Sequence, residues 1–248
     1  SLTNLIWAPI ADNIKGVSLS ANWMWPAKNL GENARLYRAV EAVSKFAIDL
    51  GINIPTGKDS LSMTQKYPNG EVVYAPGTVI ISAIGEITDL KKAVTPVIQT
   101  KLGTKLIYLN LSNSPYELGG SCFAQSLNKI GCSTPDVTNT KYFAEAFDVV
   151  QSLITEQKIL AGHDISAGGM ITTLLEMNFS NCDHGMSIDL SNIDEKDIIK
   201  IFFSENPGII IQVDDEESVI SHLKNQNIAY QIIGKVISER KLDIVHKS

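Results

Sequence analysis

Residues 105–245 alternate between strand-like and helix-like segments, and this alternation limits the folds open to the chain more than any other feature. Short apolar runs bounded by glycines and polar residues predict strands, whereas apolar side chains that recur every three or four positions predict helices. Such alternation is typical of a sheet covered by helices, so we predict an α/β domain. The predicted strands are 105–111, 160–166, 186–190, 208–213, 229–233 and 242–245, and the predicted helices are 119–130, 142–157, 168–179, 194–203 and 215–225.

The first hundred residues have a different texture, with one long helix among several strands. Apolar residues recur at helical spacing over 36–50, and Gly51 follows where a left-handed C-terminal cap is expected. Pro76-Gly77 marks a turn or a break between two β-rich runs. Beyond the helix we predict a strand over 52–55, a polar loop over 56–60, and strands over 71–75 and 78–87.

A domain boundary is expected between Leu90 and Gly103. The hydrophobic period is lost there, and lysines, a proline and a glycine are scattered through the segment. We therefore divide the chain into residues 1–100 and residues 101–248. With 248 residues, of which 44% are hydrophobic and 19% charged, the chain can bury the core of one large or two small domains.

Charge and hydropathy argue against two classes of partner. The formal net charge of −6 is unlike that of proteins that bind nucleic acid, which present a basic surface. No apolar run approaches the ~18 residues of a membrane span, and the N-terminus lacks a signal-peptide pattern, so we expect no membrane and a cytoplasmic location. The three cysteines, Cys122, Cys132 and Cys182, form neither a metal-type pair nor a disulfide framework, and we expect reduced thiols.

The stretch from Gly162 to Gly169 is the most informative for chemistry, because it lies where a strand gives way to a helix. A helix N-terminus exposes unpaired N–H groups, and glycines let a phosphate approach the backbone. The hydroxyl of Ser166 can donate to a phosphate or a ribose, and Asp164 offers a hard oxygen of the kind that Mg²⁺ prefers. The alternative is that Asp164 or Ser166 only caps the helix.

Two further segments leave alternatives open. His163 is either a general acid or base or the partner of a structural hydrogen bond. Lys58-Asp59-Ser60 either faces a ligand cleft or forms a solvated turn after a strand. The latter segment is not a phosphate-binding loop of the Walker A type, because Asn53 stands where the upstream glycine is required.

Several separated segments carry a further signal: Ser1-Leu-Thr-Asn4, Leu19-Ser-Ala-Asn-Trp-Met24, Ile54-Pro-Thr-Gly-Lys-Asp-Ser-Leu-Ser-Met63, Leu118-Gly-Gly120 and His163-Asp-Ile-Ser-Ala-Gly-Gly169. In their order and spacing they resemble the second synthetase half of large-type phosphoribosylformylglycinamidine synthases. The resemblance runs from the first residue to about Val245. Related folds, such as aminoimidazole ribonucleotide synthetase and selenophosphate synthetase, share the Asp and Gly-Gly theme but not the GKDSLSM stretch.

The resemblance implies roles for individual residues. In the family an E-x-L-T-N segment supplies a Glu and an Asn to Mg²⁺; the Asn falls on Asn4, and the Glu would precede Ser1. The H-D-x-S-[DA]-G-G segment supplies a Mg²⁺ ligand, which falls on Asp164, and a hydroxyl that contacts the nucleotide, which falls on Ser166. Many relatives have Asp where this chain has Ala167, so any role of that carboxylate is lost. The implied cofactors are Mg²⁺ and ATP or ADP, at one site between the two domains.

The resemblance also implies a fold and an activity. The expected fold is the mixed α/β, two-domain fold of aminoimidazole ribonucleotide synthetase, with an incomplete first domain, because a chain that begins at Ser1 without Met resembles a fragment. The parent enzyme would be a carbon–nitrogen ligase of de novo purine biosynthesis that uses ATP and glutamine to convert formylglycinamide ribonucleotide to formylglycinamidine ribonucleotide. No catalytic residue is assigned in this half, and the isolated fragment is expected to be inactive.

The expected partners are the nucleotide and the rest of the same polypeptide, namely the first synthetase half and a glutaminase domain. Self-association of the isolated fragment through an unpaired barrel edge is a further hypothesis. Two alternatives stay open. One is a non-catalytic half-module that supports the catalytic half, and the other is a small-molecule kinase or synthetase of the same superfold, which would hydrolyse ATP alone.

Overall fold

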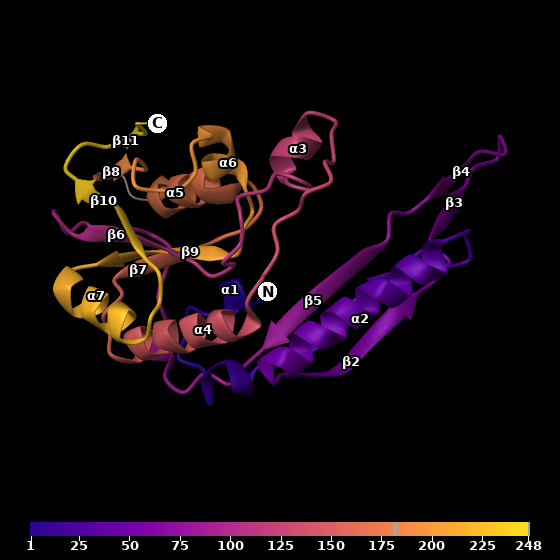
Figure 1. The fold of residues 1–248 in the computed structure, drawn as a ribbon, viewed down its shortest axis with the longest axis horizontal. Coiled ribbons are helices and arrows are strands. Elements are labelled where there is room, and N and C mark those ends of the chain that lie inside the picture. Colours follow the sequence, from indigo (N-terminus) through magenta and orange to yellow (C-terminus); the bar gives the residue numbers. More distant parts are fainter. Residues whose placement is uncertain (181–182, 248) are drawn as a thin grey trace. The chain divides into compact units, whose positions relative to one another are not determined.

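The computed structural model describes residues 1–180 and 183–247, and the chain divides into two compact units. Unit 1 comprises Ser1–Leu5 and Ile10–Glu86, and unit 2 comprises Ile6–Pro9 and Ile87–Ser248. Figure 1 shows the elements of each unit, coloured along the sequence. Each unit has its own sheet and its own core, and each is described by itself.

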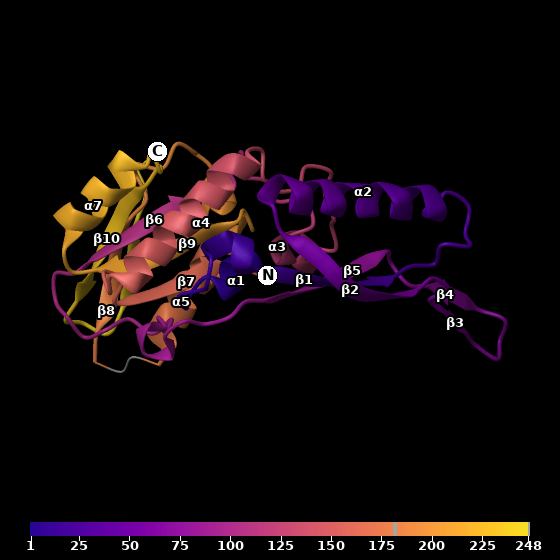
Figure 2. The ribbon, with the colours of Figure 1, turned by 90° about the horizontal axis from the view of Figure 1, so that it is seen from below.

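Unit 1 is built on a three-stranded sheet in the order β2-β1-β5, with β1 parallel to β2 and antiparallel to β5. The long helix α2 runs alongside these strands (Figure 2). A separate hairpin pairs β3 with β4. The elements are α1 (Leu2–Leu5), the 3-10 helix η1 (Asn13–Gly16), β1 (Ser18–Met24), α2 (Glu32–Leu50), β2 (Asn53–Ser60), β3 (Thr64–Lys66), β4 (Val72–Tyr74) and β5 (Thr78–Ile84).

The long helix of unit 1 is confirmed, but the polar loop predicted over 56–60 is wrong. Gly51 caps α2 in the left-handed conformation, with φ of 71°, and its N–H bonds back to the carbonyl oxygens of the last turn. Residues 56–60 instead continue β2, because they pair residue by residue with β1, from Gly57 opposite Ala21 to Ser60 opposite Met24. The sequence analysis did not predict β1, because its two serines and its asparagine are residue types that are not enriched in strands.

Unit 2 is a six-stranded sheet in the order β11-β8-β10-β6-β9-β7. Neighbouring strands are antiparallel except β11 and β8. Helices α5 and α6 cover one face and α4 and α7 the other (Figure 1). The elements are η2 (Leu90–Lys92), β6 (Lys105–Asn110), α3 (Cys122–Ser126), α4 (Thr140–Thr155), β7 (Ala161–Ile165), α5 (Gly169–Phe179), β8 (Gly185–Asp189), α6 (Ile198–Phe203), β9 (Gly208–Val213), α7 (Glu216–Asn225), β10 (Gln231–Ile237) and β11 (Leu242–Val245).

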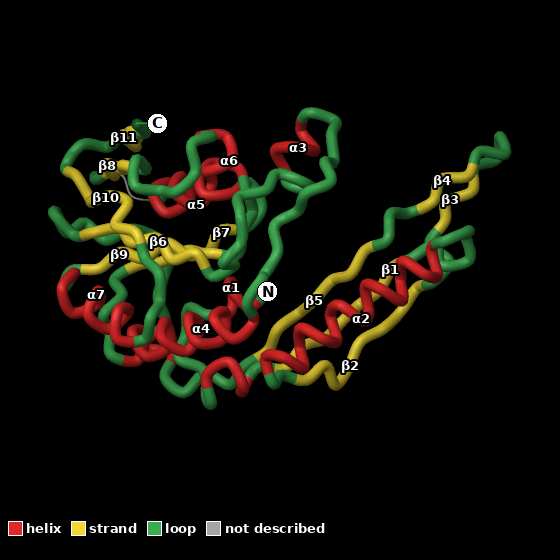
Figure 3. The backbone as a smooth tube through the Cα atoms, in the orientation of Figure 1, coloured by secondary structure: helices red, strands yellow, loops and turns green. Residues whose placement is uncertain are grey.

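The alternation predicted for unit 2 is confirmed, although two of the predicted helices are too long. Instead of a helix over 119–130 the structure has only α3, set within a long loop (Figure 3). Gly120 and Asn128, on either side of α3, have φ of 75° and 56°, which a continuous right-handed helix excludes. The helix predicted over 194–203 begins only at Ile198, where the side chain of Asp197 accepts the N–H of Ile199 as an N-terminal cap.

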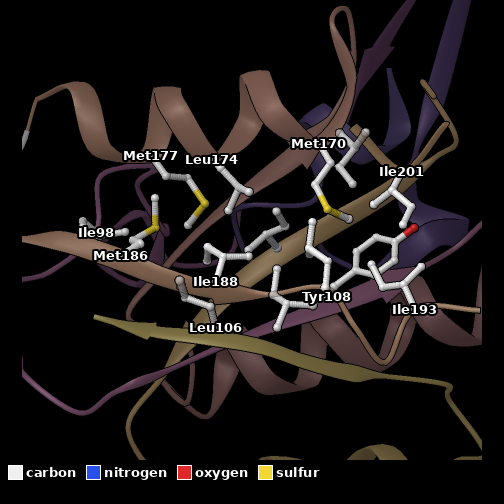
Figure 4. Close-up of a cluster of buried hydrophobic side chains, with 14 of the residues drawn as sticks. Ile98, Leu106, Tyr108, Met170, Leu174, Met177, Met186, Ile188, Ile193 and Ile201 are labelled. Carbon is white, nitrogen blue, oxygen red and sulfur yellow. The ribbon is translucent and has the colours of Figure 1, made fainter. Parts of the chain in front are cut away.

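One core cluster of unit 2 lies between the sheet and the helices α5 and α6, and the buried side chains of α4 pack on the other face. Figure 4 shows Leu174 and Met177 of α5 directed at Ile188 and Met186 of β8. Strand β9 is buried along its whole length. Its one polar side chain, Gln212, is satisfied: its Oε1 accepts the N–H of Gln99 at 2.7 Å, and its Nε2 donates to the Thr104 hydroxyl at 2.8 Å.

Two of the three cysteines can be located in the structure. Cys122 and Cys132 are free and exposed thiols, whereas Cys182 lies outside the described residues.

None of the helices in the described part of the chain combines the length and apolar character needed to cross a membrane.

Two neighbouring leucines of α5 provide a test of this core. Leu174 is 0% exposed, whereas Leu175 is 37% exposed on the same helix. We expect Leu174→Ala to lower the free energy of unfolding by about 2–5 kcal/mol, because the deletion leaves a cavity. The matched change Leu175→Ala should cost about 0.5–1 kcal/mol. Urea denaturation of both variants measures the difference, and equal losses would contradict the packing of α5.

Candidate functional site

The segment His163-Asp-Ile-Ser-Ala-Gly-Gly169 lies at the carboxyl end of β7, the edge strand that pairs with β9. Asp164 is only 4% exposed, so its carboxylate is one of the few buried charged groups in the described residues. Ser166 follows the strand and is exposed.

The two glycines that follow are required by the backbone itself. Gly168 and Gly169 have φ of 89° and 73°, a conformation that side chains strongly disfavour. A Cβ on Gly168 would lie 2.3 Å from the Thr172 hydroxyl, and one on Gly169 would lie 2.4 Å from the carbonyl oxygen of Phe202. The turn and its packing therefore explain both glycines without any ligand, a reason that differs from the predicted approach of a phosphate.

Glu205 supplies the anion at the N-terminus of α5. Its Oε1 accepts the N–H of Gly168 at 2.9 Å and the N–H of Cys122 at 2.8 Å. The alternative that Asp164 or Ser166 caps this helix is wrong, because the N-cap is Gly168 and it makes no side-chain capping bond. Since a carboxylate already accepts the N–H of the N-cap residue Gly168, a phosphate at this position would have to displace it.

Sequence reasoning missed Glu205 and its neighbours, which form a polar segment, Ser204-Glu205-Asn206, between α6 and β9. Asn206 is 1% exposed and donates from its Nδ2 to the hydroxyls of Ser112 and Ser114, at 3.0 and 2.9 Å. The Ser204 hydroxyl donates to the carbonyl oxygen of Glu117 at 3.0 Å. The run Ser-Glu-Asn before a buried strand was the only signal, and its partners lie about ninety residues earlier in the chain.

The negative charge of Glu205 also acts on the nearest thiol. It is the main cause that raises the pKa of Cys122 above its ordinary value, and burial adds to the effect. A raised pKa keeps the sulfur protonated at neutral pH, so Cys122 lacks the thiolate character of a nucleophile.

His163 is held between two carboxylates. Its Nδ1 lies 2.9 Å from the carbonyl oxygen and 3.4 Å from the Oδ1 of Asp164, and its Nε2 lies 3.1 Å from the Oε2 of Glu176 on α5. The hydrogen bond to Asp164 raises the pKa of the imidazole, burial lowers it, and the charges of Asp164 and Glu176 raise it again, with a net rise. Both ring nitrogens are engaged, which favours the structural interpretation of His163 over general acid or base catalysis.

The other predicted site residues lie in unit 1. Asn4 is exposed on α1, so its carboxamide is accessible. Lys58-Asp59-Ser60 belongs to β2 and is largely exposed, so this segment is neither a turn nor a loop. Asp164 and Ser166 both belong to unit 2, whereas Asn4 belongs to unit 1.

The donor types fit a magnesium ion that is bound partly through a nucleotide. No cluster of three or more His, Cys, Asp or Glu side chains that could hold a metal is found among the described residues. Magnesium in nucleotide sites commonly takes only one or two protein oxygens, and phosphates and waters complete its shell. The buried carboxylate of Asp164 and the carboxamide of Asn4 are oxygen donors of this kind.

Comparison with known proteins assigns both units. Residues 101–247, more than half of the chain, match the family described as AIR synthase related protein, C-terminal domain. The chain belongs to the AIR synthase related family. Residues 1–86 match a second family, described as FGAR-AT PurM_N-like domain. The predicted AIR-synthetase-like fold is thereby confirmed.

Named relatives of this AIR synthase related chain confirm the resemblance inferred from its motifs. It is 39% identical over 249 aligned residues to a probable phosphoribosylformylglycinamidine synthase of Caenorhabditis elegans. The alignment covers 95% of this chain and 18% of that protein. It is 38% identical to a probable chloroplastic/mitochondrial phosphoribosylformylglycinamidine synthase of Arabidopsis thaliana, over 98% of this chain and 17% of that protein. The chain thus spans less than a fifth of these relatives.

A solved structure shows the same fold at low sequence identity. T. maritima PurL complexed with ATP aligns with 99% of this chain and 37% of its own, with a TM-score of 0.68 and 9% identity. At this identity the likeness concerns the fold alone.

The charge of His163 generates a pH prediction. The pKa of His163 in the folded protein is raised above 6.5. The ion pairs of His163 should therefore contribute fully to stability at pH values below its pKa in the unfolded chain. This contribution should be lost as the pH rises through its pKa in the folded protein. A histidine titration followed by NMR should give a pKa for His163 above 6.5 in the native protein and a lower value in Glu176→Gln.

The matched control is Glu217→Gln, which removes the same charge from an exposed position on α7. It should leave the pKa of His163 unchanged. A pKa of His163 at or below 6.5 in the native protein would contradict the ion pair.

Proposed function

We propose that this chain is part of a phosphoribosylformylglycinamidine synthase and supplies a Mg-nucleotide site to it. The identities of 39% and 38% over almost the whole chain to two proteins of that name carry the proposal. In the reaction, the γ-phosphate of ATP is transferred to the amide oxygen of formylglycinamide ribonucleotide. Ammonia released from glutamine then displaces that phosphate, which yields formylglycinamidine ribonucleotide, ADP, phosphate and glutamate.

Each proposed site residue has one task. Asp164 and Asn4 would each offer one oxygen to Mg²⁺, which when bound neutralises phosphate charge. The exposed hydroxyl of Ser166 would donate to the nucleotide. His163 lies beside the buried carboxylate of Asp164, with 3.4 Å between Nδ1 and Oδ1, so a protonated imidazole would offset its negative charge. Because Glu205 accepts the N–H of Gly168, that group would not be available to the phosphates.

We further propose that the nucleotide site of this chain is structural. His163 has both ring nitrogens engaged, which leaves it unsuited to proton transfer. Ala167 stands between Ser166 and the two glycines and offers no carboxylate. Neither feature obstructs binding, so the arrangement is suited to hold a nucleotide but lacks a group that would act on it.

The partner that we propose for unit 1 is the rest of the polypeptide. Strands β2 and β5 are both edges of the three-stranded sheet. Along β5 the side chains of Ile80 and Ile84 are 52% and 67% exposed, on the same face of the strand. Unpaired edges beside exposed apolar side chains are surfaces that a second sheet can cover.

We also propose a cytoplasmic location. The free, exposed thiols Cys122 and Cys132 suit a reducing compartment. The Arabidopsis relative, by contrast, carries an organellar designation in its name.

A thermal melt tests the nucleotide site. Mg-ADP at about 100 times its Kd should raise the melting temperature of this chain by roughly 5–10 °C without any ATP hydrolysis, because a ligand that binds only the native state stabilises it. Asp164→Asn should lose the shift, whereas the exposed change Asp189→Asn should keep it. A shift that survives in Asp164→Asn, or that needs no Mg²⁺, would refute the assigned ligand. Turnover of ATP by this chain would refute the structural role.

Light scattering tests the proposed pairing surface. At high concentration this chain should exceed its monomer mass of 27.0 kDa through self-association of unit 1. The double change Ile80→Lys and Ile84→Lys should restore the monomer. The control Ile48→Lys removes an isoleucine that is 75% exposed on α2, and it should leave the association intact. A monomer at all concentrations would contradict the proposal.

A further inference from the structure

Unit 2 contains a cavity of about 460 Å³ that the proposed nucleotide site does not use. It lies where β6 ends at Asn110 and β10 begins at Gln231, and it is within the size range of small-molecule sites. Four tyrosines line it, from β6, the loop that follows β6, the first turn of α4 and the residue before β10: Tyr108, Tyr116, Tyr142 and Tyr230.

Three of these rings are held in place before any ligand binds. Tyr108 is 2% exposed and lies among the core side chains near Ile193 and Ile201 (Figure 4). Tyr116 donates its hydroxyl hydrogen to the hydroxyl of Tyr108 at 3.4 Å, and the hydroxyl of Tyr142 accepts the N–H of Ala229 at 3.2 Å. Fixed aromatic walls reduce the entropy lost on binding.

The electrostatic character of the cavity is negative. Among the described residues that line it, Asp194 is the only one with a charged side chain, and none is a lysine, arginine or histidine. Asp194 is exposed and takes part in none of the ion pairs found among the described residues. Burial raises the pKa of Tyr116, its hydrogen bond with Tyr108 lowers it, and the nearby charge of Glu195 raises it, with a net rise. Phosphates and carboxylates are therefore disfavoured here.

Gln231 also lines the cavity. Its Nε2 donates to the carbonyl oxygen of Asn192 at 3.4 Å, whereas its Oε1 is buried and is closed to a ligand in the cavity. The cavity thus combines aromatic faces with one carboxylate.

We propose that this cavity binds a small planar organic cation of the amidinium or guanidinium class. The flat cation would lie against the tyrosine rings, which attract positive charge through their faces. Its N–H groups would donate to the carboxylate of Asp194. This site is independent of the nucleotide site, because it contains none of the residues assigned there.

Three isosteric probes test the charge requirement: benzamidine, neutral benzamide and anionic benzoate. In titrations of this chain followed by NMR, benzamidine should shift the tyrosine signals and bind about tenfold more tightly than benzamide. Benzoate should not bind. The proposal would be overturned if benzamide bound as tightly as benzamidine, or if none of the probes bound.

Variants place the binding in this cavity. Asp194→Asn should weaken benzamidine about three- to tenfold and leave benzamide unchanged, and Tyr230→Leu should weaken both. The control Asp243→Asn removes a carboxylate from β11, which does not line the cavity, and should have no effect. Equal weakening by Asp194→Asn and Asp243→Asn would show a non-specific charge effect and overturn the assignment. Melting curves confirm that each variant is folded.

Discussion

The segment Ser204-Glu205-Asn206 is the constraint on which one whole edge of the unit 2 sheet depends. It directly precedes β9, which is buried along its length and lies between β6 and β7. Because β9 is antiparallel to both neighbours, the carboxyl ends of β6 and β7 meet at the edge where this segment begins. Glu205 holds the turn into α5 and the start of α3, while Asn206 holds the loop after β6. Two segments that are distant in sequence, the stretch from the end of β6 to the start of α3 and the turn into α5, are thereby held by one short hydrogen-bonded run.

The two sites at this edge differ in what surrounds their charges. Beside β7 the carboxylate of Asp164 is buried and is balanced by His163, which in turn reaches Glu176. Beside β6, Asp194 is exposed and lines the same cavity as four tyrosines. A buried, balanced carboxylate is suited to share a metal with an anionic nucleotide, whereas an unbalanced one beside aromatic rings is suited to a cation. The two proposed sites at this sheet edge would therefore bind ligands of opposite charge.

Unit 1 presents a different problem, because its sheet of three strands leaves two edges open. Its long helix contributes only Ala47 and Leu50 to the buried set and exposes Tyr37 and Ile48. A layer with so little buried apolar surface gains stability when another layer covers it. The identity to much longer relatives agrees with this, since the chain spans less than a fifth of them.

The sequence alone determined the elements with a clear period and the segments whose residue types are rare in combination. The sequence predicted the long helix that precedes Gly51 and the alternation of strands and helices after residue 105. It also predicted the change from strand to helix at residues 163–169. Each of these features depends on neighbours within a few positions. The tertiary structure decided what depends on distant partners. Residues 56–60 became a strand because β1 lies beside them, and Glu205 became the anion at α5 because β9 brings it there. Periodicity reports the local backbone, whereas pairing between strands and the contacts of a buried carboxylate arise only when the sheet closes.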